Sequence, residues 1–185
     1  GKHGPTAVCS ASPELFLRVD AGSRRVTTRP MKGTRPISAD PEELRASEKD
    51  RAELNMITDL MRNDLGRVCA FGSVSVDEAR TIEAHAESVW QATSTVTGTL
   101  REAVTHADLI RATFPPGSVT GAPKIRAMQL IAELERSGRG YYCGSAGWLD
   151  ESGNLELNVA IRTAQIVTLA DGSRELRYHA GAGIV

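Results

Sequence analysis

The sequence of 185 residues contains one segment that places an amine in an unusual setting: residues 30–36, PMKGTRP. Proline fixes the backbone torsion φ and removes an amide donor, so we predict a tight loop in which Lys32 is held close to the backbone. A folded wall around this loop would remove water from the amine, which favours the uncharged, nucleophilic form of a lysine. The alternative is an ordinary surface lysine, which composition alone favours.

A second segment, RAELNMITDLMRND, places carboxylates on a predicted helix. At about 100° per residue, Glu53, Ile57 and Asp64 fall within one stripe, so we expect a carboxylate on the apolar face. Such a group needs a partner, and a divalent cation that also holds an anionic substrate would be one. The alternative is a salt bridge, to Arg51, Arg62 or another part of the chain.

The third segment, FPPGSVTGAPKIRA, combines glycines with hydroxyl groups and precedes a predicted helix. Ser118 and Thr120 supply the hydroxyls, Gly121 leaves the backbone open, and Pro123 starts a helix whose free amides favour an anion. Lys124 adds positive charge. The glycine spacing is too short for a nucleotide-binding P-loop and no Ser or Thr follows the lysine, so we exclude a nucleotide triphosphatase. A small carboxylate is the better ligand; the alternative is a connection that binds nothing.

The fourth candidate combines Arg162, in the sequence IRT, with the AGAG run at residues 180–183. An arginine on a strand between apolar neighbours requires a carboxylate or phosphate, which its guanidinium binds with two hydrogen bonds. The AGAG run would let backbone amides approach a ligand closely. The alternative is a buried structural arginine.

The elements that must position these residues are predicted to form an α+β fold. Residues 14–20 and 24–28 are predicted to form a hairpin. A long helix is predicted from the cap at Asp40 to about Leu65, with Pro41 in its first turn and Glu43 completing a capping box. Another helix starts at Pro123. Further segments are predicted as a short helix (107–113) and strands (68–76, 79–83, 89–97, 141–149, 155–167, 175–180). Strand runs interrupted by helices favour antiparallel sheets with helices packed outside.

Composition excludes several classes of protein. The charges, 22 Lys+Arg against 23 Asp+Glu, give a net charge of −1, which provides no field for nucleic acid or an anionic membrane. No apolar run approaches the ~20 residues of a membrane helix. The three widely spaced cysteines argue against a disulfide framework and a thiolate zinc site, and favour a cytoplasmic protein. Because the chain starts at Gly1 and stops on two β-branched residues, we expect a fragment of a longer protein.

Taken in order, the segments resemble one family. SPELF, PMKGTRP, DRAELNMITDLMRNDLGRV, FPPGSVTGAPKIRAM, YYCGSAGWL, IRT and GAGIV resemble the chorismate-utilising enzymes, from Ser12 to the last residue. That group includes anthranilate synthase component I, isochorismate and salicylate synthases, and aminodeoxychorismate synthase component I. The resemblance implies an anthranilate-synthase-type α+β sandwich of mostly antiparallel sheets. It also implies that residues 1–185 are a partial chorismate-binding catalytic domain, without its N-terminal part and its C-terminal metal-ligand segment.

Within the family, the position of Lys32 separates subtypes: anthranilate synthases carry alanine there, and aminodeoxychorismate synthases carry lysine. The resemblance therefore implies an aminodeoxychorismate synthase component I, which converts chorismate and ammonia to 4-amino-4-deoxychorismate on the para-aminobenzoate route to folate. One alternative is an anthranilate-forming relative in which Lys32 is incidental. Another is an inactive fragment that binds chorismate or a partner subunit.

The resemblance also assigns roles. Glu14, in SPELF, matches the general acid that protonates the departing hydroxyl. Lys32 would form the covalent intermediate that ammonia displaces. Mg²⁺ would hold the ring carboxylate, with Glu53 as one ligand, and ammonia would come from a separate or fused glutamine amidotransferase. Gln91 stands where several relatives have a titratable histidine. The residues implied to bind chorismate are Gly33, Thr34, Thr120, Gly121, Tyr142, Arg162, Gly181, Ala182 and Gly183.

Overall fold

The structure is a computed structural model that describes residues 6–182. The elements along the chain are β1 (Thr6–Ser10), β2 (Leu15–Asp20), β3 (Arg25–Arg29), β4 (Met31–Pro36), α1 (Pro41–Ala46), α2 (Glu48–Gly66), β5 (Ser75–His85), β6 (Val89–Thr99), α3 (His106–Thr113), a 3₁₀ turn (Gly117–Val119), α4 (Lys124–Leu134), β7 (Ser145–Leu149), β8 (Leu155–Val159), β9 (Thr163–Thr168) and β10 (Arg174–Tyr178). Within residues 6–182, no helix combines the length and the apolar character needed to cross a membrane.

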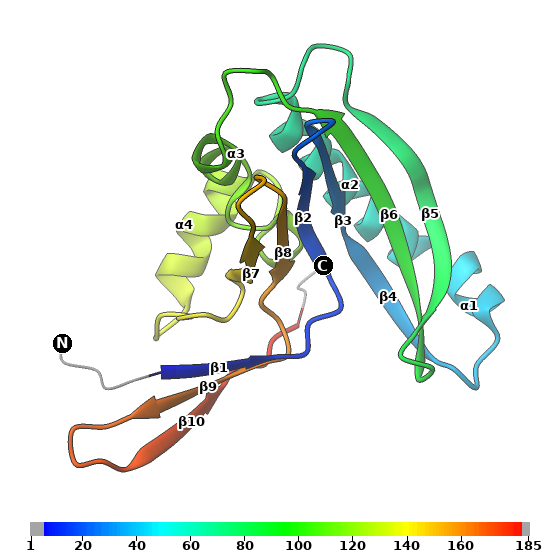
Figure 1. The fold of residues 1–185 in the computed structure, drawn as a ribbon. Coiled ribbons are helices and arrows are strands. Elements are labelled where there is room, and N and C mark those ends of the chain that lie inside the picture. Colours follow the sequence, from blue (N-terminus) through cyan, green and yellow to red (C-terminus); the bar gives the residue numbers. More distant parts are fainter. Residues whose placement is uncertain (1–5, 183–185) are drawn as a thin grey trace.

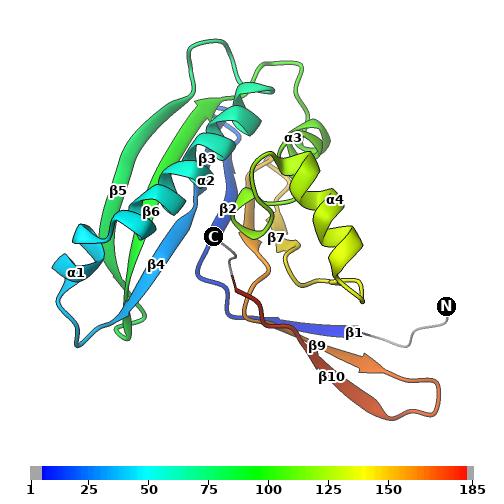
Figure 2. The ribbon, with the colours of Figure 1, turned by 180° about the vertical axis from the view of Figure 1, so that it is seen from behind.

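The strands form two sheets with antiparallel pairings. The larger, seven-stranded sheet has the order β4-β6-β3-β2-β8-β7, and β5 pairs with β6 off this path. The smaller sheet, β1-β9-β10, projects away from it (Figure 1). Seen from behind, α1 and α2 lie across one face of the larger sheet, over β4, β5 and β6 (Figure 2). The prediction of an α+β fold with mostly antiparallel sheets and helices outside is confirmed.

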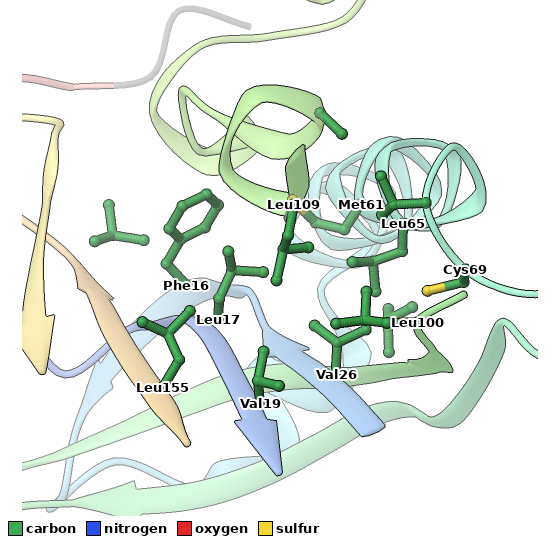
Figure 3. Packing of buried hydrophobic residues seen from close by; sticks show 14 of the residues in the cluster. Phe16, Leu17, Val19, Val26, Met61, Leu65, Cys69, Leu100, Leu109 and Leu155 are labelled. Carbon is green, nitrogen blue, oxygen red and sulfur yellow. The ribbon is translucent and has the colours of Figure 1, made fainter. Parts of the chain in front are cut away.

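The main core lies between β2, β3 and the helices. Phe16 and Leu17 of β2 pack with Met61 and Leu65 of α2 and with Leu109 of α3 (Figure 3). Phe16 and Leu17 are successive yet both buried, because β2 shifts register at this point against both of its neighbours. Burial of each large apolar side chain stabilises the fold by about 1.5–3 kcal/mol. The core therefore anchors the start of β2, where Glu14 lies.

The segment PMKGTRP is a strand, so the prediction of a loop was wrong. β4 pairs with β6 at the edge of the large sheet, and an edge strand tolerates the missing amide donors of Pro30 and Pro36. The register shifts between Lys32 and Thr34, and Gly33 within this bulge has φ +74°. The backbone between the two prolines is constrained, as expected, but its constraint comes from pairing with β6 and not from a tight loop.

The single long helix predicted from Asp40 is two helices. Ser47 adopts an extended conformation, and its side chain accepts a hydrogen bond from the Asp50 amide, so it ends α1 and caps α2. Asp40 caps α1 as predicted, but its side chain accepts from the amide of Glu42 and not through a capping box with Glu43. The sequence pattern could not distinguish a serine inside a helix from one between two helices.

Three predicted strands differ in extent. Residues 155–167 form two strands, because the backbone bends at residues 160–162 as it passes from the large sheet to the small one. Residues 141–144 form a turn before β7, and residues 68–74 contain one isolated bridge, at Cys69, before β5 begins. The hairpin of β2 and β3 and the helix α3 are confirmed.

Candidate active site

The carboxyl group of Glu14 and the amine of Lys32 meet at one residue, Ser118. Glu14 directly precedes β2, and its carbonyl accepts a hydrogen bond of 3.0 Å from the amide of Val159 at the end of β8. The residue is buried, with 5% of its surface exposed. Lys32 Nζ donates to the carbonyl oxygen of Ser118 at 3.4 Å. The three residues come from β4, the residue before β2 and the 3₁₀ turn. The structure therefore brings together the first and third of the four candidate segments, PMKGTRP and FPPGSVTGAPKIRA, with Glu14 of SPELF.

The electrostatics of Glu14 suit a proton donor. Burial raises its pKa from 4.5 to about 7, against the opposing effects of Ser118, Lys32 and the backbone of Met31. The Ser118 hydroxyl lies close enough to lower this pKa but makes no hydrogen bond of standard geometry with a described residue. A carboxylic acid that titrates near neutrality can hold a proton and release it at working pH.

Gly33 packs tightly on α1 and α2, and Thr34 contacts β6. A Cβ on Gly33 would lie 2.6 Å from Leu44 Cδ1 and 2.8 Å from Asp50 Cγ, so only glycine fits. Thr34 Oγ1 accepts a 3.3 Å hydrogen bond from Nε2 of Gln91, which is 5% exposed. The amide oxygen of Gln91 is buried without a hydrogen-bond partner among the described residues. It can accept a hydrogen bond but cannot titrate.

The hydroxyl of Thr120 forms hydrogen bonds within its own loop. Thr120 Oγ1 donates to the carbonyls of Pro116 at 3.0 Å and Gly117 at 3.3 Å. A Cβ on Gly121 would lie 3.2 Å from Cβ of Ala127 in the first turn of α4. Of the two hydroxyls in this segment, it is therefore Ser118 that lies beside the acid and the amine. The binding of a substrate carboxylate by Thr120 and Gly121 stays a prediction.

Tyr142 and the described part of AGAG form a second cluster. The Tyr142 ring stacks on His179 with centroids 5.4 Å apart, and a Cβ on Gly181 would lie 2.6 Å from the Tyr142 hydroxyl. Gly181 and Ala182 are exposed, while Gly183 lies outside the described residues. Arg139, three residues before Tyr142, donates to the carbonyl of Val119 at 2.9 Å. This bond joins the Tyr142 segment to the Ser118 turn.

Arg162 is neither buried nor on a strand, which corrects the predicted strand position and the alternative of a buried structural arginine. Its binding of a carboxylate stays a prediction. Arg162 is exposed in the bend between β8 and β9, with φ +49°. Its carbonyl accepts a hydrogen bond of 3.1 Å from the amide of Ala11. The apolar neighbours that suggested a strand instead lie where the chain leaves one sheet for the other.

The two carboxylates of the predicted stripe on α2, Glu53 and Asp64, both have cationic partners. Glu53 is partly buried and lies 3.9 Å from Nζ of Lys49, one helical turn earlier. Asp64 is buried and forms an ion pair with Lys124 of α4. Among residues 6–182, no group of three or more His, Cys, Asp or Glu side chains is placed to hold a metal ion. A magnesium ion held by Glu53 would therefore need its further ligands from substrate, water or residues that the structure does not describe.

Sequence reasoning missed the importance of Ser118 and of the pair between Asp64 and Lys124. The hydroxyls of the GSVTG run were a signal, but one-dimensional spacing could not select Ser118 over Thr120. The stripe that contained Asp64 was also a signal, but its partner lies 60 residues away.

An acid that titrates near neutrality beside an amine, on an antiparallel α+β fold, defines an enzyme-type centre for acid–base or covalent chemistry. The family model for the chorismate binding enzyme matches residues 2–185. The chain belongs to this chorismate binding enzyme family.

Its relatives carry different names within the family. The aminodeoxychorismate synthase of Streptomyces griseus is 47% identical over 98% of this chain and 25% of that protein. Aminodeoxychorismate synthase component 1 of Escherichia coli is 46% identical over 97% of this chain and 39% of its own length. Anthranilate synthase component 1 of Aquifex aeolicus is 44% identical over 96% of this chain and 36% of its own length. The chain thus spans between a quarter and two fifths of these curated relatives.

Solved structures agree with the fold. Anthranilate synthase component I of Streptococcus pneumoniae TIGR4 superposes with a TM-score of 0.74 at 39% identity, over 88% of this chain and 36% of that one. A putative 2,3-dihydroxybenzoate-specific isochorismate synthase of Bacillus anthracis superposes with a TM-score of 0.74 at 29% identity. The match covers 88% of this chain and 46% of that one. The anthranilate-synthase-type fold is thereby confirmed.

Proposed function

We propose that this chain is the chorismate-converting part of an aminodeoxychorismate synthase, which replaces the ring hydroxyl of chorismate with an amine derived from ammonia. The observation that carries the proposal is the approach of Lys32 and Glu14 to the same residue, Ser118. The names of the Streptomyces griseus and Escherichia coli relatives support it.

The chemistry follows from the two groups. Hydroxide is a poor leaving group, so Glu14 in its acid form protonates the hydroxyl, and water departs as the C–O bond breaks. The uncharged amine of Lys32 forms a C–N bond to the ring, which converts one difficult substitution into two easier steps. The lysine nitrogen passes its extra proton to the Glu14 carboxylate, which restores the acid. When ammonia displaces the lysine, Glu14 returns a proton to the lysine nitrogen, which leaves as a neutral amine, and then takes the extra proton from the new amino group. Both groups must act on one ring, which requires them to lie on the same side of the fold.

Magnesium and an ammonia source are further parts of the proposal. Glu53 is the residue we propose as one magnesium ligand; its additional ligands would lie outside the described residues. A bound divalent cation would neutralise the substrate carboxylate. A glutamine amidotransferase, as a partner subunit or a fused domain, would supply the ammonia.

The second candidate is an anthranilate-forming enzyme. It is favoured by the Aquifex aeolicus and Streptococcus pneumoniae relatives, whose identity to this chain approaches that of the aminodeoxychorismate synthases. The two candidates differ in product. Incubation of the intact protein with chorismate, Mg²⁺ and ammonia, followed by the lyase that forms para-aminobenzoate, should yield para-aminobenzoate. Formation of anthranilate would overturn the proposal, and calorimetric binding of chorismate without turnover would indicate a binding role instead.

A further inference from the structure

Ser118 is the residue through which the acid and the amine are held together. Its carbonyl accepts the hydrogen bond from Lys32 Nζ, and its hydroxyl lies beside the Glu14 carboxyl group. That hydroxyl oxygen is buried and has no hydrogen-bond partner of standard geometry among the described residues. A buried hydroxyl without a partner is costly unless some state of the site satisfies it. The ionised carboxylate of Glu14, which is a strong acceptor, provides such a state.

The turn that carries Ser118 has little freedom to move. A Cβ on the preceding residue, Gly117, would lie 2.8 Å from Leu60 Cδ2, so the backbone of the turn packs directly on α2. The hydrogen bonds of Thr120 to the carbonyls of Pro116 and Gly117 close the turn from within. The position of Ser118 is therefore determined by the backbone around it and not by its own side chain.

A single ammonium group also closes the ends of this loop, residues 114–123. Lys124 Nζ, at the start of α4, donates to the carbonyl of Thr113, the last residue of α3, at 2.7 Å. The same nitrogen forms an ion pair with Asp64 of α2. The side chains of Lys124 and Asp64 are 13% and 4% exposed, so water screens this pair little. Both ends of the loop are thus fixed to the helix on which its turn packs.

We propose that Ser118 is a positioning residue for both groups, with its carbonyl holding the Lys32 amine and its hydroxyl donating to the Glu14 carboxylate once that group has lost its proton. The catalytic meaning of this arrangement rests on the proposed function, whereas the contacts do not. Donation to the ionised form favours that form, so the hydroxyl counteracts the effect of burial on Glu14. Ser118 thereby keeps the acid within reach of neutral pH.

The direct test is the titration of Glu14 in the intact protein. Carbon-13 NMR of protein labelled at the glutamate carboxyl carbon would follow the titration, with Glu14→Gln used to assign the resonance. In Ser118→Ala the midpoint should rise by about 0.5–1 pH unit, because a hydrogen bond to the charged form is lost. In Ser118→Thr, which keeps the hydroxyl, the midpoint should stay close to that of the wild type. An unchanged or lowered midpoint in Ser118→Ala would overturn the inference.

Kinetics separate this inference from the proposed function. In Ser118→Ala the basic limb of the pH profile of kcat for chorismate amination should move to higher pH by the same amount, while Ser118→Thr keeps the wild-type limb. A shifted NMR midpoint in a protein that does not aminate chorismate would support the role of Ser118 and reject the function. Amination with no shift in either measurement would reject the role of Ser118 and keep the function. Circular dichroism and thermal unfolding would verify that both variants are folded.

Discussion

Lys32 lowers the pKa of Glu14, while burial of the Glu14 carboxyl group raises it to about 7. Lys32 lies on β4 and Glu14 directly precedes β2, and these two strands do not pair with each other in the large sheet. The backbone of Met31, next to Lys32 on β4, also lies beside the Glu14 carboxyl group, and the loop between α3 and α4 brings Ser118 to both residues. The centre therefore depends on this loop as much as on the strands.

The stability of the protein should depend on Glu14 in a defined pH range. The folded-state pKa of about 7 lies above the model value of 4.5, so the native state binds the proton more tightly than the unfolded state. This contribution is fully present below pH 4.5 and is lost as the pH rises to about 7. Relative to wild type, Glu14→Gln should gain up to about 3 kcal/mol in unfolding free energy between pH 4 and pH 8. Denaturant titrations at several pH values would measure the difference. The matched control is Glu151→Gln, which makes the same substitution at an exposed turn outside the site.

Removal of the Lys32 amine should abolish the covalent route. Lys32→Ala should lower kcat for chorismate amination by at least about 10³-fold, since the nucleophile is lost. Mass spectrometry of trapped wild-type protein should show an adduct at Lys32, absent from the variant. Lys49→Arg, which replaces an exposed amine on α2 but keeps the positive charge beside Glu53, should leave kcat near its wild-type value. Full activity of Lys32→Ala would show that Lys32 is incidental and would favour the anthranilate-forming alternative.

The bulge of β4 should not tolerate a side chain at Gly33. Gly33→Ala combines a positive φ with contacts of 2.6 and 2.8 Å, to Leu44 and Asp50, so we expect a loss of about 2–4 kcal/mol in unfolding free energy. Gly72→Ala is a matched control, because Gly72 has a similar φ of +77° but open space around the added Cβ, and should cost only about 1 kcal/mol. Equal losses in chemical denaturation would contradict the packing argument.

The buried ion pair should be required for stability. Asp64→Asn or Lys124→Met leaves one partner buried without its counter-charge, and each should cost about 3–5 kcal/mol. The double variant should lose less than the sum of the two single losses, because neither charge is left unpaired. A thermodynamic cycle from urea unfolding would measure this coupling. Additive losses would indicate that the two side chains act independently.

Much of the fold could be predicted from local sequence, because its signals are local. The turn after Asp20 defined the β2–β3 hairpin, and the Thr105–Thr113 region carried a recognisable helix. The break at Ser47 was not predictable, since a serine inside a helical pattern and a serine cap look alike until the packing of α1 and α2 is known. The PMKGTRP strand was missed because its partner, β6, lies more than 50 residues away in the sequence.

The candidate site was predictable in its residue types but not in its contacts. The ordered motifs identified Glu14 and Lys32 together with the family. The selection of Ser118 over Thr120 depends on which hydroxyl the turn uses for its own closure, and this is a property of three-dimensional geometry. Arg162 illustrates the opposite error, since apolar neighbours in sequence did not imply burial.

Because Lys32 lies beside Glu14, the two groups can exchange a proton without changing the number of protons that the pair holds. An ammonium next to a carboxylate and an amine next to a carboxylic acid hold the same number of protons and the same total charge. In the reaction that we propose, transfer of one proton between the two groups would therefore give the reactive combination without uptake from bulk solvent. An anionic ring that enters the centre meets an unchanged total charge, whichever of the two tautomeric forms is present.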